Sequence, residues 1–201
     1  MGRRFGAVWL PLMLSAGPAF AHAPVPGVRG FYVGLLHPFS TPAQALLMLG
    51  LGLLVGHLAL PTAGRQLVLF FVAAIAGLVA GQGTGALDLL MFGAAFAASA
   101  TAALLPGRLV PLVALLVALG GFCIGAVSVP DPGPAADRLF VMSGSIVGAT
   151  VGLLFLVGIV DVIRDRYNWP WVGIALRIAA AWVAAIALLM LALGVAGAPA
   201  G

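Results

Sequence analysis

Six long apolar stretches, separated by short polar segments, limit the folds open to this chain more than any other feature of its sequence. A run of roughly 20 apolar residues can cross a bilayer as an α-helix, which satisfies its main-chain hydrogen bonds internally. We therefore expect an all-α membrane protein, a bundle of six transmembrane helices. The expected helices cover about residues 42–60, 66–82, 86–105, 109–129, 138–163 and 170–194.

Composition supports the same class and excludes nucleic acid as a partner. The chain is 63% hydrophobic and 7% charged, whereas soluble domains average roughly 45–50% apolar and 25% charged residues. Its nine basic residues are all Arg and its five acidic residues are all Asp. The arginines are spread over separate short segments, and a nucleic-acid-binding protein needs them clustered on one face.

The N-terminus has the form of an export signal. Two arginines open it, an apolar core follows from Phe5 to Ser15, and residues 19–21 read Ala-Phe-Ala, which matches a cleavage site with small flanking residues. The alternative is an uncleaved anchor helix, but Pro and Gly interrupt the segment, which is shorter than the roughly 20 residues of a span. We expect a cleavable signal peptide at 1–21 and a single six-helix transmembrane domain at 22–201.

The placement of arginine predicts the topology, because cytoplasmic loops of membrane proteins carry an excess of positive charge. The expected loops after the first, third and fifth helices hold Arg65, Arg108 and the pair Arg164 and Arg166. We expect these loops to be cytoplasmic, in a multi-pass protein of the bacterial inner membrane. The mature N-terminus and the C-terminus would then both be periplasmic.

Glycine recurs every four positions in the fifth expected helix, at Gly144, Gly148 and Gly152. Residues four apart share one face of an α-helix, and a strip of small residues lets a neighbouring backbone approach closely. The strip is therefore interpreted as a packing surface. Its partner is either another helix of the same bundle or the surface of a homo-oligomer or of a membrane partner protein.

The residue types that carry catalysis are scarce. The chain has three His, one Cys and no Glu. It has no His-Glu-x-x-His zinc motif, no Gly-x-Ser-x-Gly elbow and no phosphate-binding loop. We therefore expect a protein that is not an enzyme, with no catalytic residues and no bound organic cofactor.

The segment before the first long helix carries a family resemblance. We expect a short apolar turn or half-helix over residues 30–37, ending at Pro38, and we expect Pro42 in the first turn of the Leu-rich helix that follows. Residues 30–38 read Gly-Phe-Tyr-Val-Gly-Leu-Leu-His-Pro and lead into that helix. Together with the signal peptide and an early His, this order resembles the HupE/UreJ family over residues 27–57. Arg177 and Trp182 are similar to an Arg-x-x-x-x-Trp of some members. Members are small multi-helix membrane proteins associated with hydrogenase or urease gene clusters and regarded as nickel or cobalt permeases, so the resemblance implies a transition-metal permease.

The metal motif of that family, His-Pro-x-x-Gly-x-Asp-His, is degenerate in this chain. Thr41, Ala43 and Gln44 stand where the motif has Gly, Asp and the second His. Nickel-like metals favour imidazole and carboxylate ligands, so the resemblance leaves His37, with Gln44 beside it, as the implied metal site. A second family motif, His-Gly-x-Ala-His-Gly, would fall near residues 120–125, where neither His is present.

Three further residues are singled out by position. Cleavage after residue 21 would give His22 a free amine beside its imidazole, a chelating pair suited to copper or nickel. Arg177 lies inside the last expected helix, where a charge is costly and often functional, unless its long side chain reaches the headgroups. His57, near the end of the first long helix, is interpreted as a residue of the membrane interface.

Two hypotheses for function follow from the sequence. The first is a HupE/UreJ-like integral membrane protein that moves a transition-metal ion, with nickel, cobalt or copper as the transient cargo and most of the usual ligands lost. The alternative is a non-transporting accessory or assembly subunit of a membrane or metalloenzyme system. In both, the lipid bilayer is a partner.

Overall fold

A computed structural model defines the fold of most of the chain. Within the part of the chain that it describes, there are seven α-helices and no strand, so the expected all-α class is confirmed. The predicted signal peptide, His22 and the C-terminal Gly201 lie outside the described residues. The described residues are 30–81, 87–132, 134–167 and 169–197.

The helices follow the predicted apolar stretches closely. Each predicted span corresponds to one helix, and the short helix α2 precedes them. The helices are α2 (Phe31–Ser40), α3 (Pro42–Val55), α4 (Leu60–Ala80), α5 (Asp88–Leu104), α6 (Val110–Val127), α7 (Ala135–Arg166) and α8 (Pro170–Ala196).

The described part of the chain holds four helices, or five if a bent pair counts as one, that could cross a membrane by length and composition. Among the described residues, α4, α6, α7 and α8 are each long and apolar enough to cross a membrane. Helices α2 and α3 make a fifth span if this bent pair counts as one. Helix α5 has 17 residues, at the lower limit of about 17 that a span needs. The helices fit a membrane protein, and six complete crossings stay a prediction.

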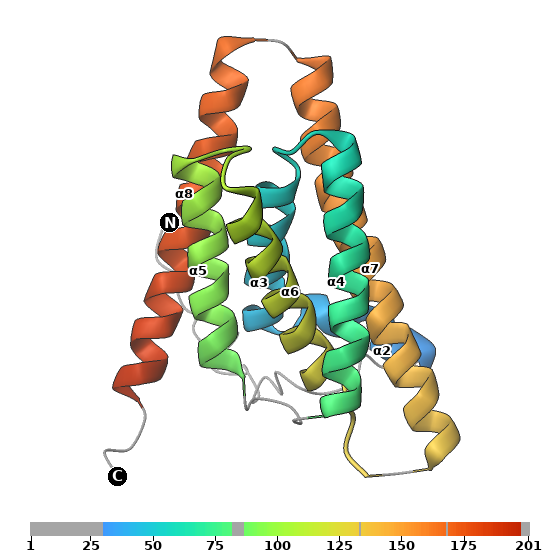
Figure 1. Ribbon diagram of the computed structural model, residues 1–201. Coiled ribbons are helices and arrows are strands. Elements are labelled where there is room, and N and C mark those ends of the chain that lie inside the picture. The colour runs from blue at the N-terminus through green and yellow to red at the C-terminus, as the bar shows by residue number, and fades with distance from the viewer. Residues whose placement is uncertain (1–29, 82–86, 133, 168, 198–201) are drawn as a thin grey trace, which may run out of the picture.

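Helix α3 lies at the centre of the bundle (Figure 1), in contact with α5, α6, α7 and α8. Around it, α4 packs on α6, α5 packs on α8, and α2 packs on α7. Leu47, Leu51 and Leu54 of α3 are almost completely buried and belong to the main hydrophobic core. The central helix is therefore the element through which the other helices are joined.

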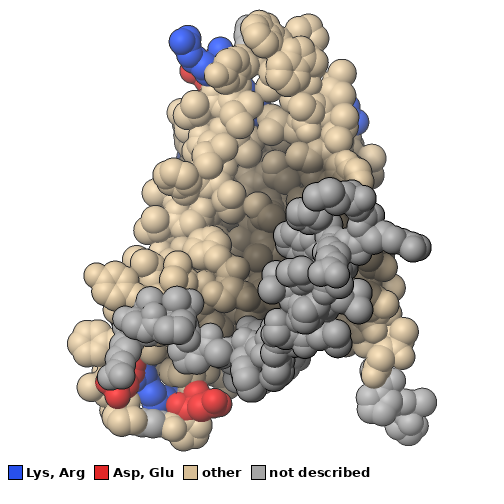
Figure 2. Space-filling view, turned by 180° about the vertical axis from the view of Figure 1, so that it is seen from behind, with Lys and Arg blue, Asp and Glu red and all other residues tan. Residues whose placement is uncertain are grey.

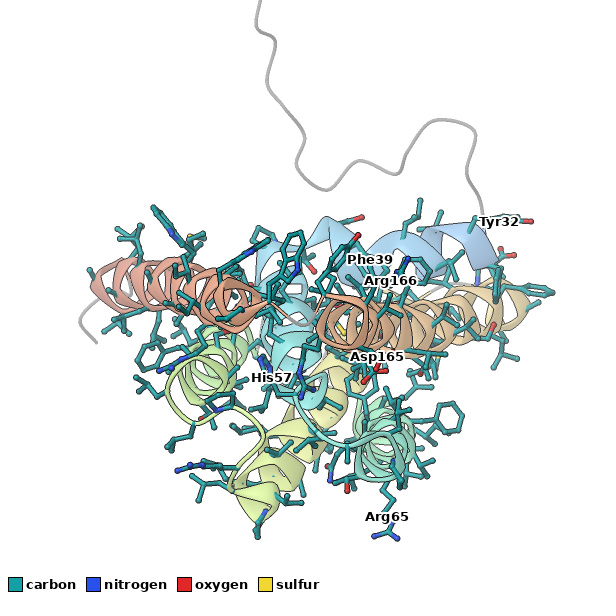
Figure 3. All side chains as sticks on the ribbon, turned by 90° about the horizontal axis from the view of Figure 1, so that it is seen from above. Tyr32, Phe39, His57, Arg65, Asp165 and Arg166 are labelled. Carbon is teal, nitrogen blue, oxygen red and sulfur yellow. The ribbon has the colours of Figure 1, made fainter. Side chains whose placement is uncertain are left out.

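Three connections gather at one end of the bundle, the upper end in Figure 1: α3–α4, α5–α6 and α7–α8. We call it the arginine end, because Arg65, Arg108, Arg164 and Arg166 lie at or near these connections. Figure 3 is seen from this end, and in it Arg65 points away from the bundle. The α6–α7 connection lies at the opposite end.

The charged side chains leave a broad uncharged band between the two ends. On the face seen in Figure 2, Arg and Asp side chains gather near the top and the bottom, and the described atoms between them are uncharged. Exposed apolar side chains such as Phe155 and Leu154 on α7 and Leu189 on α8 lie along these helices. A continuous exposed apolar surface of this kind suits contact with lipid rather than water.

Two helix boundaries differ from those expected. The half-helix predicted to end at Pro38 continues through this residue to Ser40. Proline removes only one hydrogen bond there, and the contact of α2 with α7 supports the turn. Arg65 was expected in a loop but lies in α4, because this helix begins at Leu60 with Pro61 in its first turn. A missing N–H costs nothing at that position.

Close backbone contacts at glycine hold α2 against α7. A Cβ atom added at Gly144 would collide with the carbonyl oxygen of Phe31, and one at Gly148 would collide with that of Leu35. From the other side, a Cβ at Gly34 would collide with the carbonyl oxygen of Val141. Only glycine permits this approach, so the glycine strip predicted from the sequence lies under α2 in the described structure.

Candidate functional site

The break between α2 and α3 is the first feature of the site. The two helices meet at an angle of 76°. Thr41 between them is extended, with φ −105° and ψ 129°. The residue before a proline is biased away from the α conformation, and Pro42 occupies the first turn of α3, as expected from the sequence. The local sequence therefore makes a sharp bend inside an otherwise apolar segment.

The break brings together the two residues of the degenerate metal motif. Nε2 of Gln44, in the first turns of α3, lies 3.3 Å from Nε2 of His37, in the last turn of α2. An amide nitrogen can only donate, so the imidazole nitrogen is the acceptor in this pair. Gln44 is only 2% exposed. The pair therefore joins the two helices across the bend, in a partly buried position.

Two buried oxygens at the break have no hydrogen-bond partner: Oγ1 of Thr41 and Oε1 of Gln44. Leaving a buried polar atom unpaired costs roughly 1–3 kcal/mol, and such atoms in a folded protein call for an explanation. Together with the His37 imidazole, these two oxygens are the groups at the bend that could coordinate a cation.

The third glycine of the strip is placed beside the break. A Cβ atom at Gly152 would collide with the ring of Phe39, the residue two positions after His37, and would lie 3.4 Å from Cε of Met48. Phe39 belongs to α2 and Met48 to α3. Gly144, Gly148 and Gly152 thus hold α2 and the start of α3 in the position that forms the bend.

A conventional metal site is not present in the described part of the chain. Among the described residues, no three His, Cys, Asp or Glu side chains gather closely enough to hold a metal ion. His57 lies past the other end of α3, Cys123 is buried in α6, and His22 lies outside the described residues. The break therefore offers one imidazole and uncharged oxygens, a weak set of ligands for a nickel-like cation.

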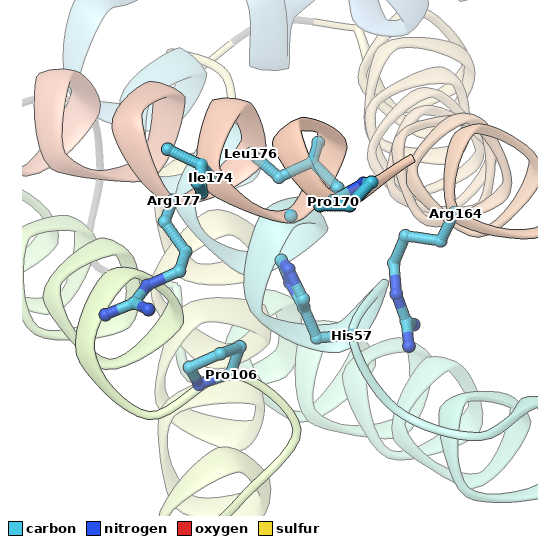
Figure 4. Close-up of a pocket in the computed structure, with 8 residues that line it drawn as sticks. His57, Pro106, Arg164, Pro170, Ile174, Leu176 and Arg177 are labelled. Atoms are coloured by element: carbon cyan, nitrogen blue, oxygen red, sulfur yellow. The ribbon is translucent and has the colours of Figure 1, made fainter. Parts of the chain in front are cut away.

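A second polar site lies at the arginine end, past the C-terminal end of α3. A pocket of about 290 Å³ lies between the α3–α4 and α5–α6 connections and the start of α8. In Figure 4, His57 lies between Arg164 and Arg177. Nη1 of Arg164 donates to the carbonyl of Gly56 at 2.8 Å. Nε of Arg177 donates to the carbonyl of Ala103 at 2.6 Å.

His57 lies outside the helices, in the α3–α4 connection. Its Nδ1 lies 2.6 Å from the carbonyl oxygen of Leu53, so Nδ1 donates to that oxygen. Burial lowers the pKa of His57 most, the nearby charge of Arg164 lowers this pKa further, and the bond to Leu53 partly offsets both effects. The imidazole is therefore held in its neutral form more strongly than a free histidine.

Sequence reasoning singled out some of these residues and missed others. It proposed a pairing or functional role for Arg177, and the structure has this guanidinium bonded to α5 and lining the pocket. It did not assign a role to Thr41 or to the contact of Arg164 with α3. The proline after Thr41 could have indicated the extended conformation of Thr41 at the bend. No pattern in the sequence predicts the contact of Arg164 with Gly56, which lies 108 positions away.

A scan against protein-family models, a search of curated proteins and a search of solved structures found no match to this chain.

Proposed function

We propose that this protein is a HupE/UreJ-like inner-membrane permease for a borderline transition-metal cation, of which nickel and cobalt are the first candidates. In this proposal the cation passes the bend between α2 and α3. The observation that carries the proposal is the His37–Gln44 contact at 3.3 Å across that bend, beside two buried oxygens without a hydrogen-bond partner.

Broken helices support a transport role on physical grounds. Non-helical backbone at membrane depth is tolerated only where protein or a water-filled cavity covers it. Transporters use such interruptions to present polar groups to a substrate near the middle of the bilayer. The bend here has this form, because it interrupts an apolar segment and leaves uncharged polar atoms without hydrogen-bond partners within it.

The strength of the ligand set also fits passage rather than storage. One imidazole and two neutral oxygens bind a divalent cation more weakly than two imidazoles and a carboxylate. Conduction requires binding that is favourable enough to admit an ion and weak enough to release it. In the proposed step, the amide nitrogen of Gln44 leaves Nε2 of His37, and the lone pair of this imidazole nitrogen replaces one water of the ion. Gln44 and Thr41 offer their oxygens as further replacements.

A second candidate function is a non-transporting accessory or assembly subunit. It is favoured by the absence, among the described residues, of a cluster of three ligating side chains. In that case the protein binds a membrane partner or a second copy of itself, and the polar atoms at the bend serve only to shape α2 and α3.

Metal uptake by proteoliposomes separates the two functions. The permease proposal expects uptake of nickel or cobalt by the wild type and a loss of roughly tenfold in His37→Ala. His57→Ala, at the opposite end of α3, is the matched control and should keep wild-type uptake. Equal uptake by His37→Ala and wild type would remove the bend as the cargo site. No uptake by the wild type would favour the accessory function.

A further inference from the structure

The pocket at the arginine end is positively charged without acidic compensation in its lining. Its lining includes Arg164, Arg177 and His57 and contains no acidic residue among the described ones. A guanidinium carries five N–H donors, and the bonds to Gly56 and Ala103 each use one of them. Both arginines are thereby held in place by main-chain carbonyls while other donors remain on each guanidinium.

The N-terminal end of α8 adds to this positive potential. Pro170 and Gly173, both in the first turn and a half of this 27-residue helix, line the pocket. A helix N-terminus carries a partial positive charge, which favours an anion. The helix end, the two arginines and the cavity thus point to the same kind of ligand.

Aromatic side chains next to the pocket place it at a membrane interface. The rings of Trp169 and Trp171 lie 5.6 Å apart, and those of Tyr167 and Trp169 lie 6.0 Å apart. All three side chains are exposed. Tyr and Trp gather at the level of the lipid headgroups, and basic pockets between transmembrane helices bind phosphate-bearing headgroups.

We propose that this pocket binds a phosphate-class oxyanion, with the guanidinium groups of Arg164 and Arg177 as its contacts. The ligand is either the phosphate of an anionic phospholipid headgroup or a free phosphate group. Arginine suits either source, because its planar fork matches the oxygens of phosphate. The inference does not depend on what the bend between α2 and α3 does.

Gly173 gives a sharp test of the pocket, because a Cβ atom added there meets nothing within 4 Å. Gly173→Asp adds a carboxylate at the lining of the pocket, at a position where the added Cβ has open space, and a carboxylate is favourable near the start of a helix. Gly173→Asn has nearly the same shape without the charge and is the matched control. Arg177→Gln removes one contact, and Arg65→Gln removes an arginine that points away from the bundle.

The measurement uses full-length protein purified in a neutral detergent. Native mass spectrometry scores retention of phosphatidylglycerol against phosphatidylcholine, both supplied as vesicles, and thermal unfolding is followed with added inorganic phosphate. We expect Gly173→Asp and Arg177→Gln to lose anion binding by roughly tenfold, while Gly173→Asn and Arg65→Gln bind as the wild type does.

The outcomes also separate the two sources. Preference for phosphatidylglycerol without an effect of inorganic phosphate assigns the pocket to a headgroup, and stabilisation by inorganic phosphate alone assigns it to a free anion. Binding that Gly173→Asp leaves unchanged, or that Arg65→Gln weakens as much as Arg177→Gln does, would overturn the proposal. Failure of the wild type to prefer either phosphate probe would overturn it as well.

Discussion

The two ends of helix α3 present polar groups of opposite kinds. At its N-terminal end, beside the bend, the groups are neutral and Gln44 is 2% exposed. At its C-terminal end, Arg164 and Arg177 surround an open pocket and both are exposed. Helix α3 has 14 residues, so the two sites are separated by about 21 Å of helix. One helix thus joins a buried uncharged site to an exposed charged one.

The difference follows from the cost of removing charge from water. A permanent charge in the interior costs several kcal/mol unless it is paired, so the buried bend uses an imidazole, a hydroxyl and an amide. Guanidinium groups at the end of the bundle keep part of their surface exposed. There they cap helix ends, since Arg164 and Arg177 bond carbonyls at the C-terminal ends of α3 and α5.

The two ends also differ in what supports them. Close backbone contacts at Gly144 and Gly148 hold the bend, whereas side-chain hydrogen bonds from α7 and α8 hold the arginine end. Close packing cannot adjust to an added atom without strain. A solvated arginine side chain can move to accommodate an added atom. Changes at the bend should therefore have larger effects on stability than changes at the arginine end.

The largest expected effect concerns topology, because each end of the bundle should face only one side of the membrane. A reporter fused after Gly201 should be active only in its periplasmic form, because the arginine end is proposed to face the cytoplasm. Cleavage of the signal is part of the same topology, so the mature chain should begin at His22 by mass spectrometry. Cytoplasmic activity of the Gly201 fusion would reverse the assignment of the two ends.

The next effect concerns the packing that holds the bend. Gly148→Leu should lower the free energy of unfolding by about 3 kcal/mol, because its side chain would force α2 away from α7. Gly158→Leu, also on α7, is the matched control, since a Cβ there meets nothing within 4 Å. Thermal stability and oligomeric state of the purified protein should be measured for both variants.

The two outcomes of that experiment have distinct meanings. Equal stability of Gly148→Leu and Gly158→Leu would show that α2 does not pack on the glycine strip. A stable monomer formed by Gly148→Leu from an oligomeric wild type would make the strip a surface between subunits, which favours the accessory function.

A smaller effect on stability should separate the function of the bend from its structure. Gln44→Leu removes a buried oxygen without a partner but also the hydrogen bond to His37. These two effects oppose each other, so the free energy of unfolding should change by less than about 1 kcal/mol. Uptake of metal should nevertheless be lost. Gln66→Leu is the control, because Gln66 is also buried, at 6% exposed, and its Oε1 also has no partner. This variant should keep uptake, and it should be at least as stable as Gln44→Leu because it loses no contact with His37.

Equal metal uptake by the two glutamine variants would count against the bend as the transport site. If Gln44→Leu and Gln66→Leu transport equally well, Gln44 serves only to join α2 to α3. If both lose uptake, the loss reflects the removal of a buried amide in general and not the bend.

The smallest effect is a pH dependence confined to the arginine end. Burial and Arg164 lower the pKa of His57 below 6.5 in the folded protein, so folding favours its neutral form. The stability that this contributes is present above pH 6.5 and is lost as the pH falls through the lowered pKa. Arg164 and Arg177 are the charged groups that line the same pocket.

Thermal unfolding at neutral and mildly acidic pH measures this effect. His57→Gln should lose less stability on acidification than the wild type does, because it has no proton to take up. An identical pH dependence of the two proteins would mean that His57 does not titrate in a buried environment.

The sequence by itself determined which segments are helical and which connections share an end. Apolar stretches and prolines act locally, so α6 and α8 begin and end within about three residues of the expected positions. Short connections force each helix to reverse direction, which brings Arg108 and Arg164 to the same end. The sequence also singled out Gly144, Gly148 and Gly152 by their spacing.

Only the tertiary structure decided what those features contact. The spacing of the glycines left open whether a helix of the same chain or another subunit covers them, and α2 covers them. Likewise, Arg177 meets Ala103 across 74 positions of sequence. Helix formation depends on neighbours along the chain, whereas the partner of a glycine face or of an arginine depends on which backbones can approach within contact distance. That approach is a property of the whole bundle, because each helix restricts where the others can pack.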